Sequence, residues 1–179
     1  MKRTLALLAA TTVLALAACG KVSETAAEKM IESQIGKDGT QAKVDMSGGG
    51  MKITTTDASG KVSQMEMGTA KVSEADIGLP FYPGTQPREG EMTKVSTPEG
   101  SMVTVTLHSD DAPAKVAGFY RDKLKAQAQG KQFTEMSAAD AHTLMLADDK
   151  SKQLTQVTVA KGDGKGSEIQ IMAHRTTGK

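Results

Sequence analysis

The chain has 179 residues, with 22 Lys and Arg against 21 Asp and Glu, which allows one medium or two small domains and excludes a large multidomain enzyme. Apolar residues make up 38% beside 18 glycines, which excludes wholesale disorder, and the near-zero net charge gives no basis for nucleic acid binding. A single cysteine excludes a disulfide framework and a cysteine-rich zinc site.

The N-terminus has the organisation of a bacterial export signal. Lys2 and Arg3 precede an uncharged apolar stretch, residues 5–18, which is shorter than the roughly 20 residues that a membrane-spanning helix needs. The stretch ends in Leu16-Ala17-Ala18-Cys19, which resembles the lipobox of bacterial lipoproteins. We therefore predict that residues 1–18 are a lipoprotein signal peptide.

The lipoprotein resemblance implies a defined processing of the chain. Cleavage would fall between Ala18 and Cys19, the Cys19 thiol would carry diacylglycerol, and the new amino group would be acylated, for example with palmitate. The expected partner is then a membrane, reached through the lipid anchor. Gly20 stands where an aspartate would imply retention in the inner membrane, so we expect the outer membrane, with the body facing the periplasm or the cell surface.

The next segments form a tether and a small module. Residues 19–24 are a short lipidated tether. Thr25 and Glu28 have capping-box spacing at the start of a helix that ends before Gly36. Alternating apolar residues then predict short strands around 43–46, 51–55 and 62–67. Residues 25–70 are therefore predicted to be a small N-terminal helix-plus-hairpin module.

Residues 71–90 are a proline-rich connector with three of the five prolines. Pro83-Gly84 is typical of the centre of a type II turn, in which the glycine has positive φ. Phe81 and Tyr82 hold two of the five aromatic rings of the chain. They are a possible binding site for a partner, or a local core that clamps the connector to its domain, and the pattern favours the clamp.

Residues 91–179 form the predicted C-terminal domain. Strands are expected around 93–97, 103–107, 144–147, 154–160 and 168–174, with a helix from about 112 to 129 that Asp110 or Asp111 caps and Pro113 begins. The predicted fold class is α+β: an antiparallel sheet of about five strands packed on one helix in the order ββ-α-βββ, preceded by the small helix-plus-hairpin module.

The body of the chain has a second, shorter resemblance. Tyr82-Pro83-Gly84, a strand hairpin and a helix with Phe119-Tyr120-x-x-x-Leu124 resemble a group of uncharacterised bacterial envelope proteins over residues 79–174. Phe133 stands where many of these proteins have tryptophan. The resemblance supports the fold and implies no activity.

No residue is predicted to be catalytic. The only cysteine is assigned to the lipid, and His108, His142 and His174 stand near no serine in a nucleophile motif. Asp110-Asp111 and Asp148-Asp149 suit a helix cap and a turn, and the glycine-rich residues 162–167 lack the spacing of a phosphate-binding loop.

The methionines raise the question of a copper site. Met65 and Met67 place two thioethers on one strand face, Met46 and Met51 flank a triple glycine, and thioethers are ligands of Cu(I). The same positions follow the apolar alternation of strands, where methionine fills a core that is poor in phenylalanine. We therefore predict no metal site and no cofactor.

Three functional hypotheses follow. The first is a non-enzymatic, lipid-anchored cell-envelope protein that contacts a periplasmic or cell-wall partner. The second is a lipoprotein inhibitor of an enzyme such as a lysozyme or protease, which acts through a hairpin loop. The third is a copper- or metal-handling lipoprotein.

Overall fold

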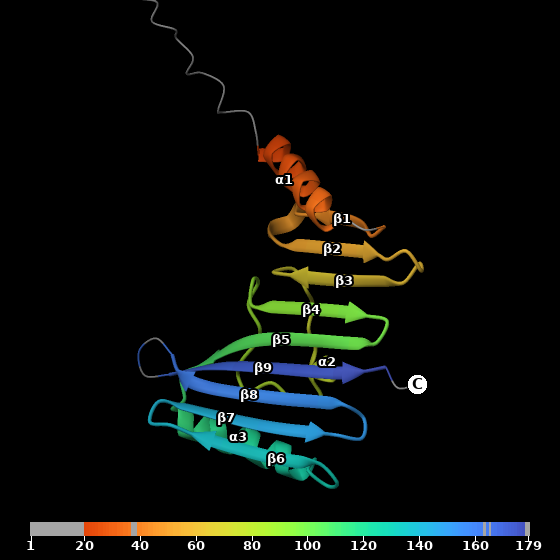
Figure 1. Ribbon diagram of the computed structural model, residues 1–179. Helices are drawn as coiled ribbons and strands as arrows, with labels where there is room; N and C mark the ends of the chain where they lie inside the picture. The colour runs from red at the N-terminus through yellow and green to blue at the C-terminus, as the bar shows by residue number, and fades with distance from the viewer. Residues whose placement is uncertain (1–19, 37–38, 163, 165, 178–179) are drawn as a thin grey trace, which may run out of the picture.

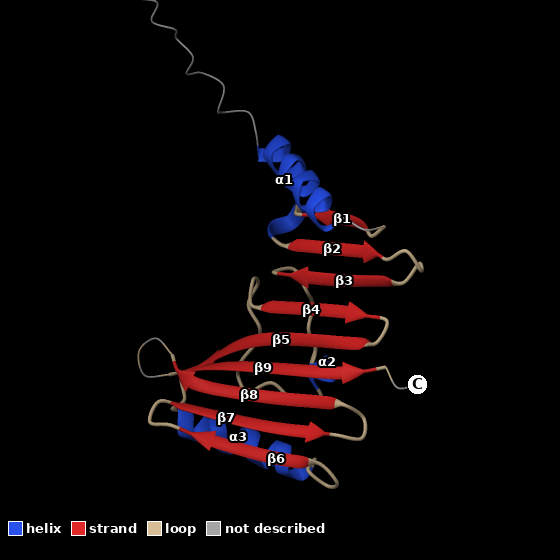
Figure 2. Cartoon of the chain, in the orientation of Figure 1, coloured by secondary structure: helices blue, strands red, loops and turns tan. Residues whose placement is uncertain are grey.

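The structure is a computed structural model that describes residues 20–36, 39–162, 164 and 166–177. The predicted signal peptide, its cleavage site at Ala18 and the lipidation site Cys19 lie outside the described residues. The elements, shown in Figures 1 and 2, are α1 Gly20–Ile35, β1 Gln41–Asp45, η1 Ser47–Gly49, β2 Met51–Thr56, β3 Val62–Met67, α2 Glu74–Ile77, β4 Met92–Thr97, β5 Gly100–Ser109, α3 Pro113–Ala126, β6 Gln132–Ser137, β7 Ala141–Asp148, β8 Gln153–Lys161 and β9 Ser167–Thr176.

A single nine-stranded antiparallel sheet runs through the whole described chain, in the order β1-β2-β3-β4-β5-β9-β8-β7-β6. The predicted α+β class, with about five strands on one helix and a separate hairpin module before them, is wrong. The pairing of β3 with β4, from Gln64 opposite Ser96 to Met67 opposite Thr93, joins the two segments. A three-stranded module alone would leave β3 as an unpaired edge over a thin core, and pairing with β4 removes that edge.

Three elements were not predicted: the short η1, strand β6 and helix α2. Strand β6 was missed because Glu135 stands at a position that faces α3, where a buried strand would have an apolar residue. The bidentate ion pair of Glu135 with Arg121 of α3, with Nε to Oε2 at 2.8 Å, satisfies that charge. Helix α2 lies in the connector and has a capping box between Ser73 and Asp76, a spacing that the sequence displays.

The helix starts differ from those predicted. α1 begins at Gly20, so residues 20–24 of the predicted tether are helical and the capping box of Thr25 and Glu28 is wrong. The N-cap of α3 is Ala112, without a side-chain hydrogen bond, and Pro113 is the first helical residue as expected. Asp111 is not the cap; its carboxylate serves another contact described below.

The main core lies between α3 and one face of strands β5, β9, β8 and β7. Its fully buried large side chains are Tyr120, Ile77, Leu107, Leu124, Leu144, Ile169, Ile171, Val105, Val116, Val157 and Val159. Each such aliphatic side chain contributes roughly 1.5–3 kcal/mol through burial. Phe119 of α3 is only partly buried against this core.

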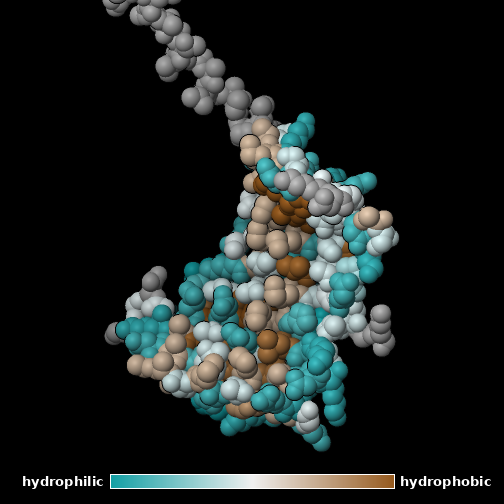
Figure 3. Space-filling model, in the orientation of Figure 1, coloured by the Kyte–Doolittle hydropathy of each residue, from teal (hydrophilic) through white to brown (hydrophobic). Residues whose placement is uncertain are grey.

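The sheet changes its apolar face between its two ends. In β5, Val103 is buried toward α3, whereas its neighbour Met102 points to the opposite side, which we call the open face. Across the strands, Val44, Ile53, Met65, Val95 and Met102 stand directly opposite one another and form one apolar row on the open face. Figure 3 views this face and shows apolar atoms running from α1 along the sheet.

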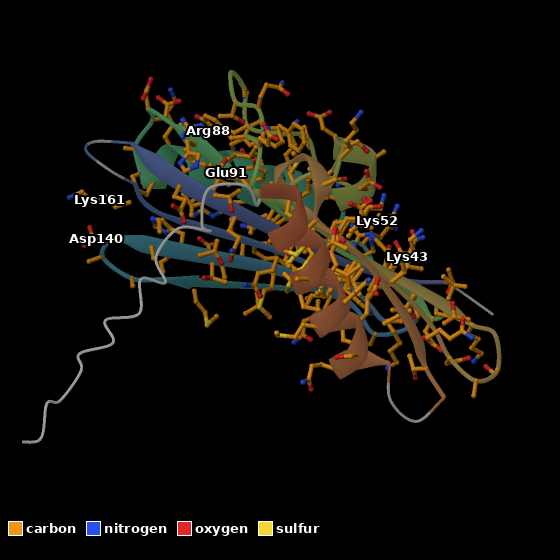
Figure 4. All side chains as sticks on the ribbon, turned by 90° about the horizontal axis from the view of Figure 1, so that it is seen from above. Lys43, Lys52, Arg88, Glu91, Asp140 and Lys161 are labelled. Atoms are coloured by element: carbon orange, nitrogen blue, oxygen red, sulfur yellow. The ribbon has the colours of Figure 1, made fainter. Side chains whose placement is uncertain are left out.

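Polar residues occupy the other face at this end of the sheet. Lys43 of β1 and Lys52 of β2 lie together on the α3 side, as Figure 4 shows, and Lys52 pairs with Glu66 at 2.9 Å. α3 does not extend to these strands, so this side is solvated. The sheet therefore has two cores on opposite faces, one under α3 and a thinner one under α1.

Helix α1 closes the outer edge of β1. The Glu28 and Glu32 carboxylates accept hydrogen bonds from the backbone N–H groups of Met46 and Val44, both at 2.8 Å. Residues four apart on a helix are about 6 Å apart, close to the roughly 6.8 Å between alternate residues of a strand. The spacing of the two glutamates therefore matches the spacing of the two N–H groups. Glu28, predicted to cap its own helix, thus satisfies a strand edge that would otherwise be open to pairing.

The capping box of α2 predicts a loss of stability in acid. Asp76 accepts hydrogen bonds from Ser73 and from Lys94 Nζ at 2.9 Å, and these bonds lower its pKa from 3.8 to about 2. The bonds therefore contribute stability that is fully present above pH 4 and is lost as the pH falls toward 2. Solvent screening at this partly exposed group reduces the contribution to about 1 kcal/mol.

Urea titrations between pH 5 and pH 2 test this expectation. We expect Asp76→Asn to flatten the fall in unfolding free energy across that window, relative to the native chain. Asp149→Asn, at an exposed aspartate in the β7–β8 turn, is the matched control. An unchanged pH dependence in Asp76→Asn would show that the capping box does not stabilise the fold.

Candidate functional site

Tyr82, one of the two possible binding residues of the connector, is part of the core. Its side chain is only 6% exposed, and its ring lies edge-on to Phe119 with centroids 5.2 Å apart. The hydroxyl donates a hydrogen bond to Asp111 Oδ2 at 2.7 Å. Burial and this bond raise the pKa of Tyr82, and the Tyr82 bond, followed by that from Lys115, lowers the pKa of Asp111. These contacts support the clamp interpretation, with α3 as the surface to which the connector is clamped.

Phe81, the other possible binding residue, is half-buried against the same core. Its backbone N–H donates to the Glu74 carboxylate at 2.7 Å, which ties the connector to α2. The turn that follows is of type II, as predicted, because Thr85 N–H donates to the Tyr82 carbonyl at 3.0 Å and Gly84 has φ of 80°.

A polar groove of about 580 Å³ lies beside this turn, at the end of β5. It is lined by Pro83, Gly84, Thr85, Arg88, His108, Ser109, Asp110, Asp111, Gly162, Gly166, Ser167 and Glu168. Two of its polar side chains are engaged, since His108 Nε2 contacts Glu91 Oε1 at 2.6 Å and Ser167 Oγ donates to the Asp111 carbonyl at 2.6 Å. The labels in Figure 4 locate Arg88 and Glu91. The groove mixes both signs of charge and presents no reactive arrangement.

Each of the three histidines contacts a different partner. His108 pairs with Glu91, and His174 Nδ1 lies 3.2 Å from the Lys152 carbonyl. His142 Nδ1 lies 3.0 Å from Ser137 Oγ, an exposed serine–histidine contact on the β6–β7 hairpin. A hydrolase would need a carboxylate to orient that histidine, but the neighbouring Glu135 is engaged by Arg121.

The structure places Met65 and Met67 on one face of β3, as the alternation requires, and Met51 of β2 directly opposite Met67. The three thioethers are half-buried on the open face, next to the apolar row. Within the described ranges, no group of three or more His, Cys, Asp or Glu side chains could hold a metal ion.

A titration with Cu(I) tests the methionines. We expect one equivalent of Cu(I) to leave the melting temperature unchanged, because a ligand that binds only the native state must raise it. A rise that is lost when Met65 and Met67 are both replaced by leucine, and kept in a Met136→Leu control, would make metal handling the leading function.

The open face supplies the largest surface without a helix over it. At the end of α1, Ile35 lies over Ile53, Met65 and Val95 and lines with them a groove of about 250 Å³. Beyond α1 the apolar row reaches the surface at Met102, which is 39% exposed. We name this region the open-face stripe and define it by Met65, Val95, Met102, Thr104 and Met172, which lie on β3, β4, β5 and β9.

The sequence predicted the strands that carry the stripe but not the stripe itself. Alternation assigns residues to two faces of each strand, and only the register between strands decides which residues form a row. One sequence signal could have indicated the stripe. Residues two positions apart share a strand face, as Met65 and Met67 do in β3 and Met102 and Thr104 do in β5.

No protein-family model, curated protein or solved structure matches this chain. The functional argument therefore rests on its own residues. Among the described residues, no helix combines the length and the apolar character that crossing a membrane requires.

Proposed function

We propose that this chain is a lipid-anchored bacterial cell-envelope protein, held in the outer membrane through Cys19, that acts as a non-enzymatic binding module for a periplasmic or cell-wall partner. The observation that carries the proposal is the N-terminal pattern: two basic residues, the apolar residues 5–18 and the single cysteine at the end of Leu16-Ala17-Ala18-Cys19. The resemblance of this pattern to the lipoprotein signal supports both the anchor and the compartment.

The start of α1 places the predicted anchor at one end of the sheet. α1 begins at Gly20, immediately after Cys19, and it packs at the β1 end of the sheet (Figure 1). The spacings between nine strands, each about 4.8 Å, then place β6 roughly 38 Å away from β1.

The open-face stripe supports the binding role. Its centre is apolar, with Met102 exposed, and a histidine, glutamines and a threonine of β9 and β8 flank it: His174, Gln170, Gln156 and Thr158. This is the composition of a surface that a protein partner with an apolar centre fits. Methionine side chains adapt to different partner shapes. The engagement of Glu135 by Arg121, beside the exposed Ser137 and His142, supports the non-enzymatic part of the proposal.

Site-specific photo-crosslinking in cells tests the proposal. With the crosslinking residue at Thr104 in the stripe, we expect a discrete adduct with one envelope protein. The matched control carries the same residue at the exposed Lys123 of α3, on the far side of the sheet, and should give none. The Thr104 adduct should decrease when Met102 is replaced by aspartate, since the charge would have to be buried. Equal adducts from both positions, or none from Thr104, would contradict the binding role.

A further inference from the structure

The two edges of the sheet are built differently. At one edge, Glu28 and Glu32 of α1 accept the outward N–H groups of β1. At the other edge lies β6, and none of the hydrogen bonds between described backbone groups reaches its outer side. Figure 1 shows α3 behind β6 and no strand beyond it. Each chain therefore has one closed edge and one open edge.

Apart from the inward-facing Glu135, strand β6 lacks the features by which proteins protect an edge. It contains no proline and no lysine, and it pairs with β7 without a bulge from Gln132 opposite Ala147 to Ser137 opposite His142. Gln132, Thr134 and Met136 point to the open face and are exposed. The single charge, Glu135, is neutralised by Arg121 of its own chain. A flat, neutral edge of this kind is suited to pairing with another strand.

We propose that β6 pairs antiparallel with β6 of a second copy of this chain, so that a two-fold axis passes through Thr134. Directly opposite residues of an antiparallel pair have their side chains on the same face of the sheet. The two-fold axis must therefore pass through a residue rather than between two residues. In the middle of β6 that residue is Thr134 or Glu135. An axis at Glu135 would place two carboxylates opposite each other. An axis at Thr134 places two threonines together, a favourable cross-strand pair, and sets Gln132 opposite Met136.

The closed edge makes the second copy a better occupant than a growing stack of chains. Because α1 covers β1, β6 is the one open edge among the described residues, and pairing through it stops the assembly at two copies. The result is a continuous sheet of eighteen strands, nine from each chain. An axis perpendicular to the sheet keeps both open faces, and both α1 helices, on the same side. The pairing does not depend on the proposed lipid anchor.

Disulfide trapping in the full-length chain tests the pairing. On the two-fold axis, the β-carbons of two Thr134→Cys residues would lie within bonding range, so mild oxidation should give a reducible band at twice the mass for most of the chains. Gln41→Cys, at an exposed position of the closed edge strand β1, is the matched control and should give little of that band. The native chain, whose only cysteine is Cys19, measures any crosslink that forms through Cys19 itself. Such a crosslink would contradict the lipid assignment, whereas the pairing is judged by the additional crosslink of Thr134→Cys.

A second variant measures the pairing without oxidation. Thr134→Lys puts two ammonium groups opposite each other at an exposed position, which leaves the fold of each copy intact and should halve the mass that light scattering reports for the detergent-solubilised native chain. A native chain of single mass, or trapping at Thr134→Cys no greater than at Gln41→Cys, would overturn the proposal. A Thr134→Cys crosslink to a different protein would also overturn it and would assign the edge to that partner.

Discussion

Replacing Cys19 by serine is expected to abolish lipidation completely and to leave the chain as an uncleaved precursor. The thioether forms on a sulfur atom, and Cys19 is the only cysteine of the chain. The lipidated chain gains roughly 0.8 kcal/mol for each buried methylene, and three acyl chains together hold a protein firmly at a bilayer. We expect labelling with a palmitate analogue in the native chain and none in Cys19→Ser, together with a larger apparent mass for the variant in electrophoresis.

A second substitution separates lipidation from sorting. Gly20→Asp leaves the cysteine in place, so acyl labelling should continue, but the aspartate after the cysteine should retain the protein in the inner membrane of an enterobacterial host. Density-gradient fractionation of membranes measures this shift. Normal labelling and cleavage of Cys19→Ser would remove the lipoprotein assignment, whereas an unmoved Gly20→Asp would remove only the sorting argument.

Tyr82→Ala is expected to produce the largest loss of stability, about 3–5 kcal/mol in unfolding free energy, which is the range for truncation of a buried aromatic ring. The ring is 6% exposed and packs edge-on against Phe119 and near Tyr120. Its loss leaves a cavity under α3 and removes the hydroxyl that donates to Asp111. Urea titration of the native chain and the variant measures the difference.

Tyr82→Phe is the matched control, because it keeps the ring and removes only the hydrogen bond. We expect a cost of about 1.5–3 kcal/mol, since a hydrogen bond to a charged group contributes in that range. If Tyr82→Ala instead left stability unchanged and abolished a crosslinked partner, the clamp interpretation would fail and the connector would become the binding site.

Much of the secondary structure follows from local patterns that the sequence displays. Alternation located eight of the strands approximately, Pro113 marked the start of α3, and Pro83-Gly84 marked a type II turn. These features depend on residues within a few positions of one another, and the same physics acts on them in any context. The N-terminal lipoprotein pattern is of the same kind, and the prediction of lipidation at Cys19 depends on the sequence alone.

Long-range pairing decided the rest. Glu28 has the spacing of a capping residue, but its carboxylate bonds to Met46 because α1 lies along β1. The charge of Glu135 is unusual on the covered face of a strand, and the ion pair with Arg121 of α3 compensates it. In both cases the partner is distant in sequence, so no local pattern could indicate the interaction.

The sequence by itself predicted the export signal, and it located most strands and the turn beside Tyr82. Only the tertiary structure decided that β3 pairs with β4, that one sheet has apolar rows on opposite faces at its two ends, and that α1 covers one edge while β6 remains open. The physical reason is that the alternation of apolar and polar residues assigns side chains to the two faces of a strand but does not determine which face another element covers. That choice depends on which helix packs against the assembled sheet, and it is made only when all nine strands are in register.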